Sequence, residues 1–385
     1  MKIKNIEKAA ERIIKAVSNQ EQIIIYGDSD LDGVSSMVIL KETISNLSKS
    51  VNVFAFSPIR NEGHGLNYQA LDFIKSKVSE GLIITLDCGI TNFNEIKEAK
   101  NSGFSVVVVD HHKPLGKVPE DAEIVVAPKQ DGDETIFKEY ANVGLTFKLS
   151  REILKDKMSP MLEQSFLELV ALGTISDMMI EEDENKEWIE KGLEGIQMSQ
   201  RPAIRAIFSM LNPMNFSSKR DMVSKVNSAL NSSSIDNHVH KTYLFLLEND
   251  FDKAIEVAEE LIDESNRKQR EVASLTEELI EKISKENNNI IFEGSYVWKA
   301  EYLGAVASRL SNYFNKPVFL YKKGERTSRG TVRMNKGGDA VKAMNSCKDI
   351  LVMFGGHAPA AGFTVENNNI EEFKKCLQEY FSALD

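Results

Sequence analysis

The sequence predicts an α/β fold: a parallel sheet with helices on both faces, then a long connector helix and a smaller α/β domain. Short, almost wholly apolar strand patterns alternate with helical patterns over residues 22–128. One highly charged helical pattern covers residues 254–287. Strand and helix patterns then alternate again from residue 289 to the C-terminus. Together these observations predict two α/β parts separated by a helix.

The first part begins with an amphipathic helical pattern at residues 1–17, which lacks the apolar core of a signal peptide. Apolar strand patterns follow at residues 22–26, 51–56, 82–86, 105–109 and 123–128. Helical spacing separates them at residues 34–47, 70–78 and 93–103, the last ending at Gly103. Because strands buried on both faces are typical of parallel sheets, we expect right-handed crossovers between them.

The pattern is helical from about residue 140 to 210, whereas the polar, Asn- and Ser-rich residues 211–250 predict no firm element. In the last part, strand patterns lie at residues 289–294, 318–323, 330–334 and 361–365, with helices at 303–314 and 371–384.

Composition places the chain among ordinary globular proteins. Its 385 residues suffice for two or three domains, with 42% apolar and 27% charged residues. No apolar run approaches the roughly 20 residues that span a bilayer, so we expect a cytoplasmic protein without a membrane partner. Cys88, Cys347 and Cys376 show no metal or disulfide spacing, which predicts a reducing compartment and no cysteine-based zinc site.

The net charge of −11 argues against a general nucleic-acid coat protein. It does not exclude an enzyme on nucleic acid, because carboxylates of a metal site add negative charge that cations offset. Residues 316–336 form a local basic patch that is either a solvated strand face or a phosphate-contacting surface. Against Glu325 it carries Lys316, Lys322, Lys323, Arg326, Arg329, Arg333 and Lys336.

Carboxylates follow three of the predicted strands at the point where each strand ends. They are Asp28, Asp30 and Asp32 after the first strand, Asp87 after the third, and Asp110 with His111 and His112 after the fourth. Because ligands bind beyond the carboxyl ends of parallel strands, we expect these side chains to share one edge. Asp177 follows an apolar helical pattern that could return to the same edge.

So many carboxylates in one place would repel one another unless cations lay among them. Oxygen ligands with imidazole suit Mn²⁺ or Mg²⁺ better than zinc or copper. Two such ions about 4 Å apart can activate a water and stabilise the leaving oxygen of a phosphoryl group. One histidine of the pair could bind metal while the other donates to phosphate. A turn or helix cap explains any one loop alone; the three together favour a two-metal phosphodiesterase.

The second α/β part carries candidate phosphate contacts. Gly355 and Gly356 would let the backbone approach a phosphate, and His357 could donate to it, although a tight turn explains them equally well. Ser308-Arg309 and Arg329 could grip a strand backbone, or could be ordinary surface residues.

The motifs resemble, in order and spacing, those of the DHH phosphoesterase superfamily. They are Asp30-Leu31-Asp32-Gly33, Asp87-Cys88-Gly89, Asp110-His111-His112 and Gly173-Thr174-Ile175-Ser176-Asp177. Residues 355–363 resemble the glycine-histidine motif of the DHHA1 domain, and residues 58–66, 127–130, 143–148 and 304–310 resemble RecJ-type single-strand nucleases.

The resemblance implies a DHH catalytic domain at residues 1–210, a helical connector at 211–288 and a DHHA1 substrate-binding domain at 289–385. It also implies stepwise phosphodiester hydrolysis of single-stranded DNA or RNA, with Asp87, His111 and His112 central to catalysis. Two Mn²⁺ or Mg²⁺ ions would be held by Asp30, Asp32, Asp87, His111 and Asp177, with Asp28 and Asp110 as ligands or just behind them. His112 would contact the scissile phosphate, while Ser308, Arg309, Arg329, Gly355, Gly356 and His357 would hold the strand.

The chain also departs from bacterial RecJ proteins, which are longer and carry an OB-fold for which these residues leave no room. This size resembles archaeal RecJ-like proteins, some of which associate with the GINS replication complex. Residues 221–234 lack the arginines that end the bacterial DHH domain, so the direction of strand degradation, 5′-to-3′ or 3′-to-5′, stays open. The alternatives are a phosphodiesterase for short oligoribonucleotides or cyclic dinucleotides, and a non-enzymatic replisome scaffold that binds GINS, which the full aspartate set disfavours.

Overall fold

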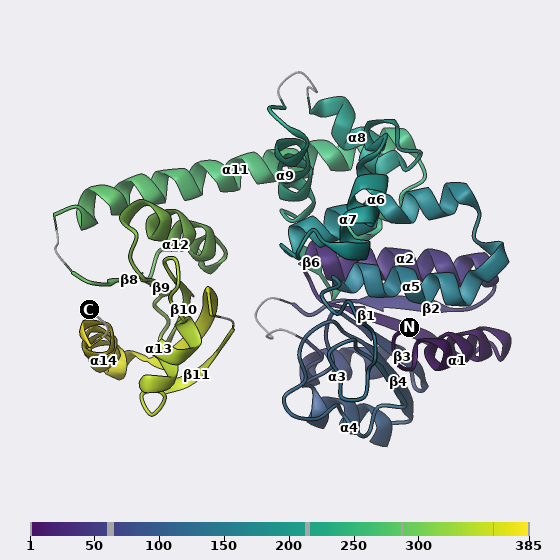
Figure 1. Cartoon of the computed structure of the whole chain (residues 1–385), viewed down its shortest axis with the longest axis horizontal. Coiled ribbons are helices and arrows are strands. Elements are labelled where there is room, and N and C mark those ends of the chain that lie inside the picture. The colour runs from purple at the N-terminus through teal and green to yellow at the C-terminus, as the bar shows by residue number, and fades with distance from the viewer. Residues whose placement is uncertain (1, 60–64, 212–215, 286–287, 357, 384–385) are drawn as a thin grey trace. The chain divides into compact units, whose positions relative to one another are not determined.

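The computed structural model describes residues 2–59, 65–211, 216–285, 288–356 and 358–383. The chain divides into two compact units, Met1–Ser265 and Asn266–Asp385 (Figure 1). Residues 211–265 therefore group with the N-terminal unit. The separate connector domain at residues 211–288 stays a prediction.

The N-terminal unit is built on a five-stranded, wholly parallel sheet of order β2-β1-β3-β4-β5, which confirms the expected fold class. Its strands are β1 (Ile23–Gly27), β2 (Val53–Phe56), β3 (Gly81–Leu86), β4 (Phe104–Val109) and β5 (Ile124–Val126). From β1 the chain adds β2 on one side and then returns to add β3 on the other. The strand order therefore reverses beside β1, which is where open parallel sheets bind ligands.

Helices cover both faces of this sheet (Figure 1). One face packs against α1 (Ile6–Ser18), α2 (Leu31–Leu47) and α5 (Asn142–Leu154), and the other against α3 (Tyr68–Lys77) and α4 (Phe93–Asn101). Successive strand residues alternate between the two cores, so Ile23 and Ile25 join one core while Ile24 and Tyr26 join the other. This alternation explains why the strands read as unbroken apolar runs.

The rest of the N-terminal unit is mostly helical, as the sequence predicts for residues 140–210. Its elements are α6 (Pro160–Ser176), α7 (Asp183–Leu193), α8 (Pro202–Met210), α9 (Lys219–Leu230), the short antiparallel pair β6 (Ile235–Asp236) and β7 (Val239–His240), and α10 (Lys241–Leu247). The last four lie in the polar region that predicts no firm element, because Asn and Ser favour turns and caps over helix interiors.

Helix α11 (Phe251–Ile283) matches the long charged helical pattern. Ala254, Ala258 and Leu261 on it pack into the N-terminal core. Val272 and Leu279 pack into a core of the C-terminal unit. None of the helices within the described ranges has the length and apolarity needed to cross a membrane.

The C-terminal unit holds a second five-stranded sheet of order β11-β12-β10-β9-β8, in which only β8 and β9 pair in parallel. Its elements are β8 (Ile291–Ser295), α12 (Ala300–Phe314), β9 (Val318–Lys322), β10 (Thr327–Arg333), α13 (Ala340–Ser346), β11 (Leu351–Gly356), β12 (Ala360–Glu366) and α14 (Ile370–Ser382). Side chains of α14 and α13 join the core on one face, and those of α12 and α11 the core on the other.

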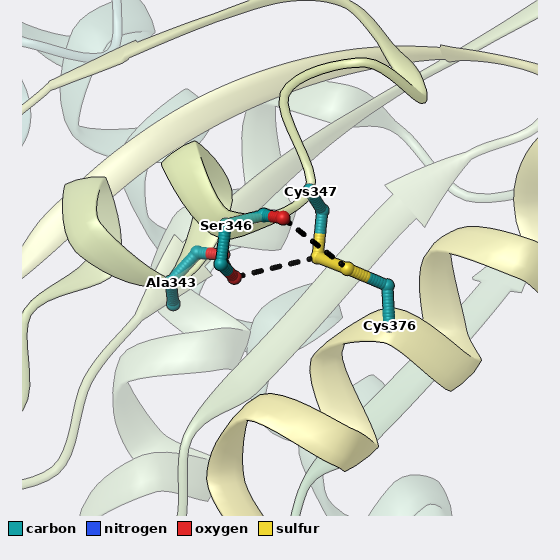
Figure 2. Close-up of a disulfide and its surroundings, with 4 residues drawn as sticks. All are labelled: Ala343, Ser346, Cys347 and Cys376. Atoms are coloured by element: carbon teal, nitrogen blue, oxygen red, sulfur yellow. Dashed lines mark hydrogen bonds between the residues drawn. A yellow bond between two sulfur atoms is a disulfide. The ribbon is translucent and has the colours of Figure 1, made fainter.

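A disulfide joins Cys347, at the end of α13, to Cys376 in α14 (Figure 2). The expectation that the cysteines form no disulfide was therefore wrong. The two residues are 29 positions apart in the sequence but become neighbours because α13 packs against α14. Cys88 is buried and unpaired. Cysteine usage consequently gives no support to a reducing compartment.

Candidate metal centre

Three strand ends and one helix end meet beyond the carboxyl edge of the parallel sheet, as the sequence predicts. The acidic loop after β1, Asp87 after β3, and the histidine pair after β4 meet Asp177, which ends α6. In each of three groups the ligand atoms lie within 4.8 Å of one another: Asp28, Asp30 and Asp87; Asp32, His111 and Asp177; and Asp87, His111 and His112. The geometry thus offers adjoining oxygen and nitrogen donor sets.

A tight turn after β1 aims its carboxylates at this edge. Asp30 is the N-cap of α2, and its side chain accepts a hydrogen bond from the N–H of Gly33 at 3.0 Å. A Cβ atom on Gly33 would lie 2.5 Å from the carbonyl oxygen of Asp28. Only glycine allows the turn to close this tightly.

Asp32 is held from behind by α5. Its two carboxylate oxygens accept hydrogen bonds from the N–H groups of Asn142 and Val143, each at 2.7 Å. A helix N-terminus favours a negative charge. Even so, burial raises the pKa of Asp32 well above its usual range, and the nearby charges of Asp30 and Asp177 raise it further. The surrounding protein groups therefore do not fully compensate the negative charge of this carboxylate.

Asp87 adopts a left-handed backbone conformation with φ of 61° and is almost fully buried. Its Oδ1 atom makes no hydrogen bond and lies 3.2 Å from Nε2 of His111. Burial, then the charges of Asp32 and Asp30, raise the pKa of Asp87 well above its usual range. A buried carboxylate oxygen without a hydrogen-bond donor is the kind of atom that a cation would satisfy.

His111 is prepared to act as a neutral ligand. Its Nδ1 atom is 2.9 Å from the carbonyl oxygen of Tyr140, which fixes the proton on that nitrogen and leaves Nε2 as a base. Nε2 faces the carboxylates of Asp87 at 3.2 Å and Asp177 at 3.7 Å. Burial, and then the charge of His112, lower the pKa of His111 to about 4. At neutral pH His111 is therefore uncharged.

His112 is the opposite case, because Asp110 holds it as a cation. Burial alone would lower its pKa, but a 2.8 Å hydrogen bond from Nδ1 to Asp110 and the charge of that carboxylate raise it to about 9. Asp110 also accepts from the N–H groups of Ile90 and His112, at 3.0 and 2.9 Å. The His112 side chain is 45% exposed, so this cation is available to a ligand.

The residues present fit divalent cations of the hard, oxygen-preferring kind. Carboxylates predominate, the histidine nitrogen among them is uncharged, and burial also raises the pKa of Asp177, to about 6. Raised carboxylate pKa values in one cluster mean that the negative charges lack compensation. Mn²⁺ or Mg²⁺ would provide it.

The C-terminal unit carries the other candidate site residues. Ser308 and Arg309 lie on α12, Arg329 on β10, and Gly355 and Gly356 at the end of β11, whereas His357 lies outside the described residues. Both Arg309 and Arg329 are exposed. No contact described within this unit assigns them a ligand, so their roles stay predictions.

Sequence reasoning missed the partners that hold these side chains. Arg333 donates from Nε to Ser308 at 3.1 Å and from Nη1 to Thr331 at 2.9 Å, and burial lowers its pKa. In the sequence it is only one more cation of the basic patch. Likewise, no motif marks Tyr140 or Asn142, although the backbone carbonyl of Tyr140 contacts His111 and the backbone N–H of Asn142 donates to Asp32.

Comparison with known proteins agrees with this geometry. The family model of the DHH family, N-terminal domain, matches residues 22–174, and that of the DHHA1 domain matches residues 287–383. The chain is 32% identical to the single-stranded-DNA-specific exonuclease RecJ of Bacillus subtilis, over 98% of this chain and 48% of that protein. It is 30% identical to RecJ of Salmonella typhimurium, over 98% of this chain and 69% of that protein. It thus spans about half to two thirds of these relatives.

Among solved structures, a crystal structure of exonuclease RecJ bound to manganese superimposes with a TM-score of 0.82 at 27% identity. The match covers 99% of this chain and 95% of that one. Both units of the present chain therefore have counterparts in a single known architecture.

Proposed function

Because the chain belongs to the RecJ family of DHH proteins, we propose that it is a metal-dependent exonuclease that hydrolyses single-stranded DNA or RNA. The observation that carries the proposal is a set of three ligand groups linked through Asp87 and His111, in which Oδ1 of Asp87 is buried without a hydrogen-bond partner. A pair of divalent ions is the chemistry that such a set of buried carboxylates supports.

We assign two Mn²⁺ or Mg²⁺ ions to this cluster. The ligands in this proposal are Asp28, Asp30, Asp32, Asp87, His111 and Asp177. When bound, such ions supply Lewis acidity that activates a water and polarises the scissile phosphodiester. Asp110 has a different role in the proposal, because it belongs to none of the three ligand groups and its oxygens accept hydrogen bonds from Ile90 and His112. It positions His112 and keeps that side chain charged.

His112 is the proposed phosphate contact. With Nδ1 bound to Asp110, its remaining N–H is free to donate to a phosphoryl oxygen. A charge-assisted hydrogen bond of this kind stabilises the negative charge that grows on phosphate oxygens during attack. Nδ1 of His112 lies 3.9 Å from Oδ1 of Asp87. This closeness supports the proposal that His112 contacts the phosphate that lies beside the metal ligands.

In this proposal, residues of the C-terminal unit bind the nucleic-acid strand. Exposed Arg309 and Arg329 would contact backbone phosphates, while Ser308 and the Gly355-Gly356-His357 segment would approach the end of the strand. Single-stranded nucleic acid is thus the proposed partner, and the cytoplasm the proposed location.

A second candidate is hydrolysis of short oligonucleotides, including dinucleotides. The net charge of −11 favours it, because long nucleic acids are bound chiefly through cationic surfaces. Binding to a GINS-type replication complex would be compatible with either activity. The complete ligand set argues for an enzyme in both cases.

A side-by-side digestion tests the proposal. Single-stranded DNA and RNA labelled at the 5′ or 3′ end, and an unlabelled dinucleotide, are incubated with the full chain and Mn²⁺. We expect stepwise shortening of a labelled strand, lost in Asp87→Ala and His111→Ala variants that remain folded. Cleavage of the dinucleotide alone would select the second candidate. Metal-independent activity, or activity retained in either variant, would contradict the metal centre.

A further inference from the structure

Asn142 occupies a junction behind the metal centre. It is the first residue of α5 and is fully buried. The preceding residue, Ala141, offers no side-chain cap, so the first N–H groups of the helix need a partner from elsewhere. Asn142 and Val143 give their N–H groups to Asp32. One end of a helix thereby holds the carboxylate in place.

The side chain of Asn142 reaches two further segments. In the amide orientation that satisfies both of its ends, the NH₂ group donates to the carbonyl oxygen of Val109 at 2.9 Å. The amide oxygen accepts from the hydroxyl of Ser36 at 3.1 Å and from the N–H of Asp87 at 2.9 Å, an N–H that also lies 3.1 Å from the carbonyl oxygen of Val109. In the opposite orientation, the amide oxygen of Asn142 would face the carbonyl oxygen of Val109. Asn142 thus contacts the end of β3, the end of β4 and helix α2.

The contacts reach segments that carry proposed ligands. Asp87 is contacted at its own N–H, and Val109 lies two residues before His111. Two residues before Asn142, the carbonyl of Tyr140 holds Nδ1 of His111. A single short segment at the start of α5 therefore fixes a carboxylate, a strand end and an imidazole.

We infer that Asn142 is a positioning residue that holds Asp32, Asp87 and the strand end before His111 in their metal-binding arrangement before any ion arrives. The inference rests on the proposed function. Carboxylates that repel one another would spread apart without such a restraint; an anionic restraint would add to the repulsion, and a cationic one would compete with the metal ions. An amide is a suitable group because it both donates and accepts without charge. Partners behind metal ligands commonly change metal affinity 10- to 100-fold.

Mn²⁺ binding to the full chain tests this directly, by calorimetry and by electron paramagnetic resonance. We expect Asn142→Ala to weaken Mn²⁺ binding at least tenfold, and to lower kcat while leaving KM for an oligonucleotide nearly unchanged. Asn142→Asp keeps the shape but adds a charge and loses the donor to Val109, so it should weaken binding as well. The matched control is Asn227→Ala, which removes a buried amide that donates to the carbonyl of Leu172 in α6.

A milder variant keeps the test decisive if Asn142→Ala does not fold. Ser36→Ala removes only the hydroxyl that donates to the amide and should weaken Mn²⁺ binding by a smaller factor. Equal Mn²⁺ affinity in the wild type and in folded Asn142 and Ser36 variants would overturn the inference about Asn142 and leave the proposed function standing. A wild-type chain that binds no Mn²⁺ would instead overturn the proposed function.

Discussion

At the scale of single residues, Asp87 combines an unusual backbone with a buried charge. Its positive φ is one that asparagine and aspartate tolerate better than other residues with a side chain. The charge itself is disfavoured, because burial and neighbouring carboxylates raise its pKa. Asp87 is thus kept at a cost in stability that the proposed function explains.

We therefore predict that Asp87→Asn separates stability from activity. The substitution keeps the left-handed backbone and removes a charge that burial and neighbouring carboxylates disfavour, so the metal-free protein should become more stable. Mn²⁺-dependent hydrolysis should disappear. Urea unfolding in the presence of a chelator, together with a nuclease assay, checks both parts. A less stable variant would contradict the electrostatic account.

Glu168 gives a pH-dependent prediction that is independent of the metal centre. Burial raises its pKa from 4.5 to about 7, although a hydrogen bond from Ser199 and the charge of Arg201 oppose the shift. The folded state therefore holds a proton that the unfolded state releases near pH 4.5. The contribution of Glu168 to the free energy of unfolding is fully present below pH 4.5. It falls by about 3 kcal/mol as the pH rises to about 7.

Glu168→Gln should remove this dependence. We expect the variant to match the wild type at pH 4 and to be more stable at pH 8. The difference in unfolding free energy between the two proteins, measured at both pH values, isolates Glu168 from other titrating groups. A constant difference would show that Glu168 does not retain its proton.

Arg329→Ala should weaken substrate binding more than turnover. Arg329 is exposed and distant in sequence from the proposed ligands, so its loss removes a phosphate contact and leaves the chemistry intact. The slope of log Kd against log salt for single-stranded DNA should fall by about 0.7. Anisotropy titrations at several salt concentrations check this, with Lys375→Ala on α14 as the control. An unchanged slope would remove Arg329 from the strand-binding surface.

Sequence reasoning located the carboxylates and histidines because their positions follow from strand ends in a parallel sheet. It could not locate Asn142 or Arg333, whose partners are backbone atoms or hydroxyls from distant segments. Contacts of this kind leave no periodicity or spacing in the chain.

At the scale of elements, the strands and long helices were predictable because the apolar positions that define them are consecutive or regularly spaced. The elements α9, β6, β7 and α10 between residues 211 and 250 were not, because the buried side chains of α9 and α10 lie within an Asn- and Ser-rich sequence that predicts no firm element. The disulfide escaped prediction for a third reason. It depends on how two helices pack, which spacing along the chain does not reveal.

The turn between β1 and α2 gives a prediction at this scale. Alanine normally stabilises a helix by about 1 kcal/mol relative to glycine. Gly33→Ala should do the reverse, since its Cβ would meet backbone atoms of Asp28 at 2.5 and 2.8 Å. The variant should be less stable and bind Mn²⁺ more weakly, because the turn that carries Asp30 must open. A thermal melt with a parallel Mn²⁺ titration checks this, and a more stable variant would contradict it.

At the scale of the whole molecule, the chain has two units with separate apolar cores. We predict two unfolding transitions in calorimetry. Dithiothreitol should lower only the transition of the C-terminal unit, because Cys347 and Cys376 both belong to it. A loop of 29 residues predicts a loss of about 3–4 kcal/mol. A single transition, or an equal shift in both, would contradict this division.

The bridge between Cys347 and Cys376 also turns the intervening segment into a covalent ring that contains β11 and β12. A protease that cuts the backbone once within that ring leaves a nicked protein whose two polypeptides remain tied together. The fragments would migrate as one species in a non-reducing gel and separate only after reduction. The disulfide would therefore hold the two fragments together even after the backbone between Cys347 and Cys376 has been cut.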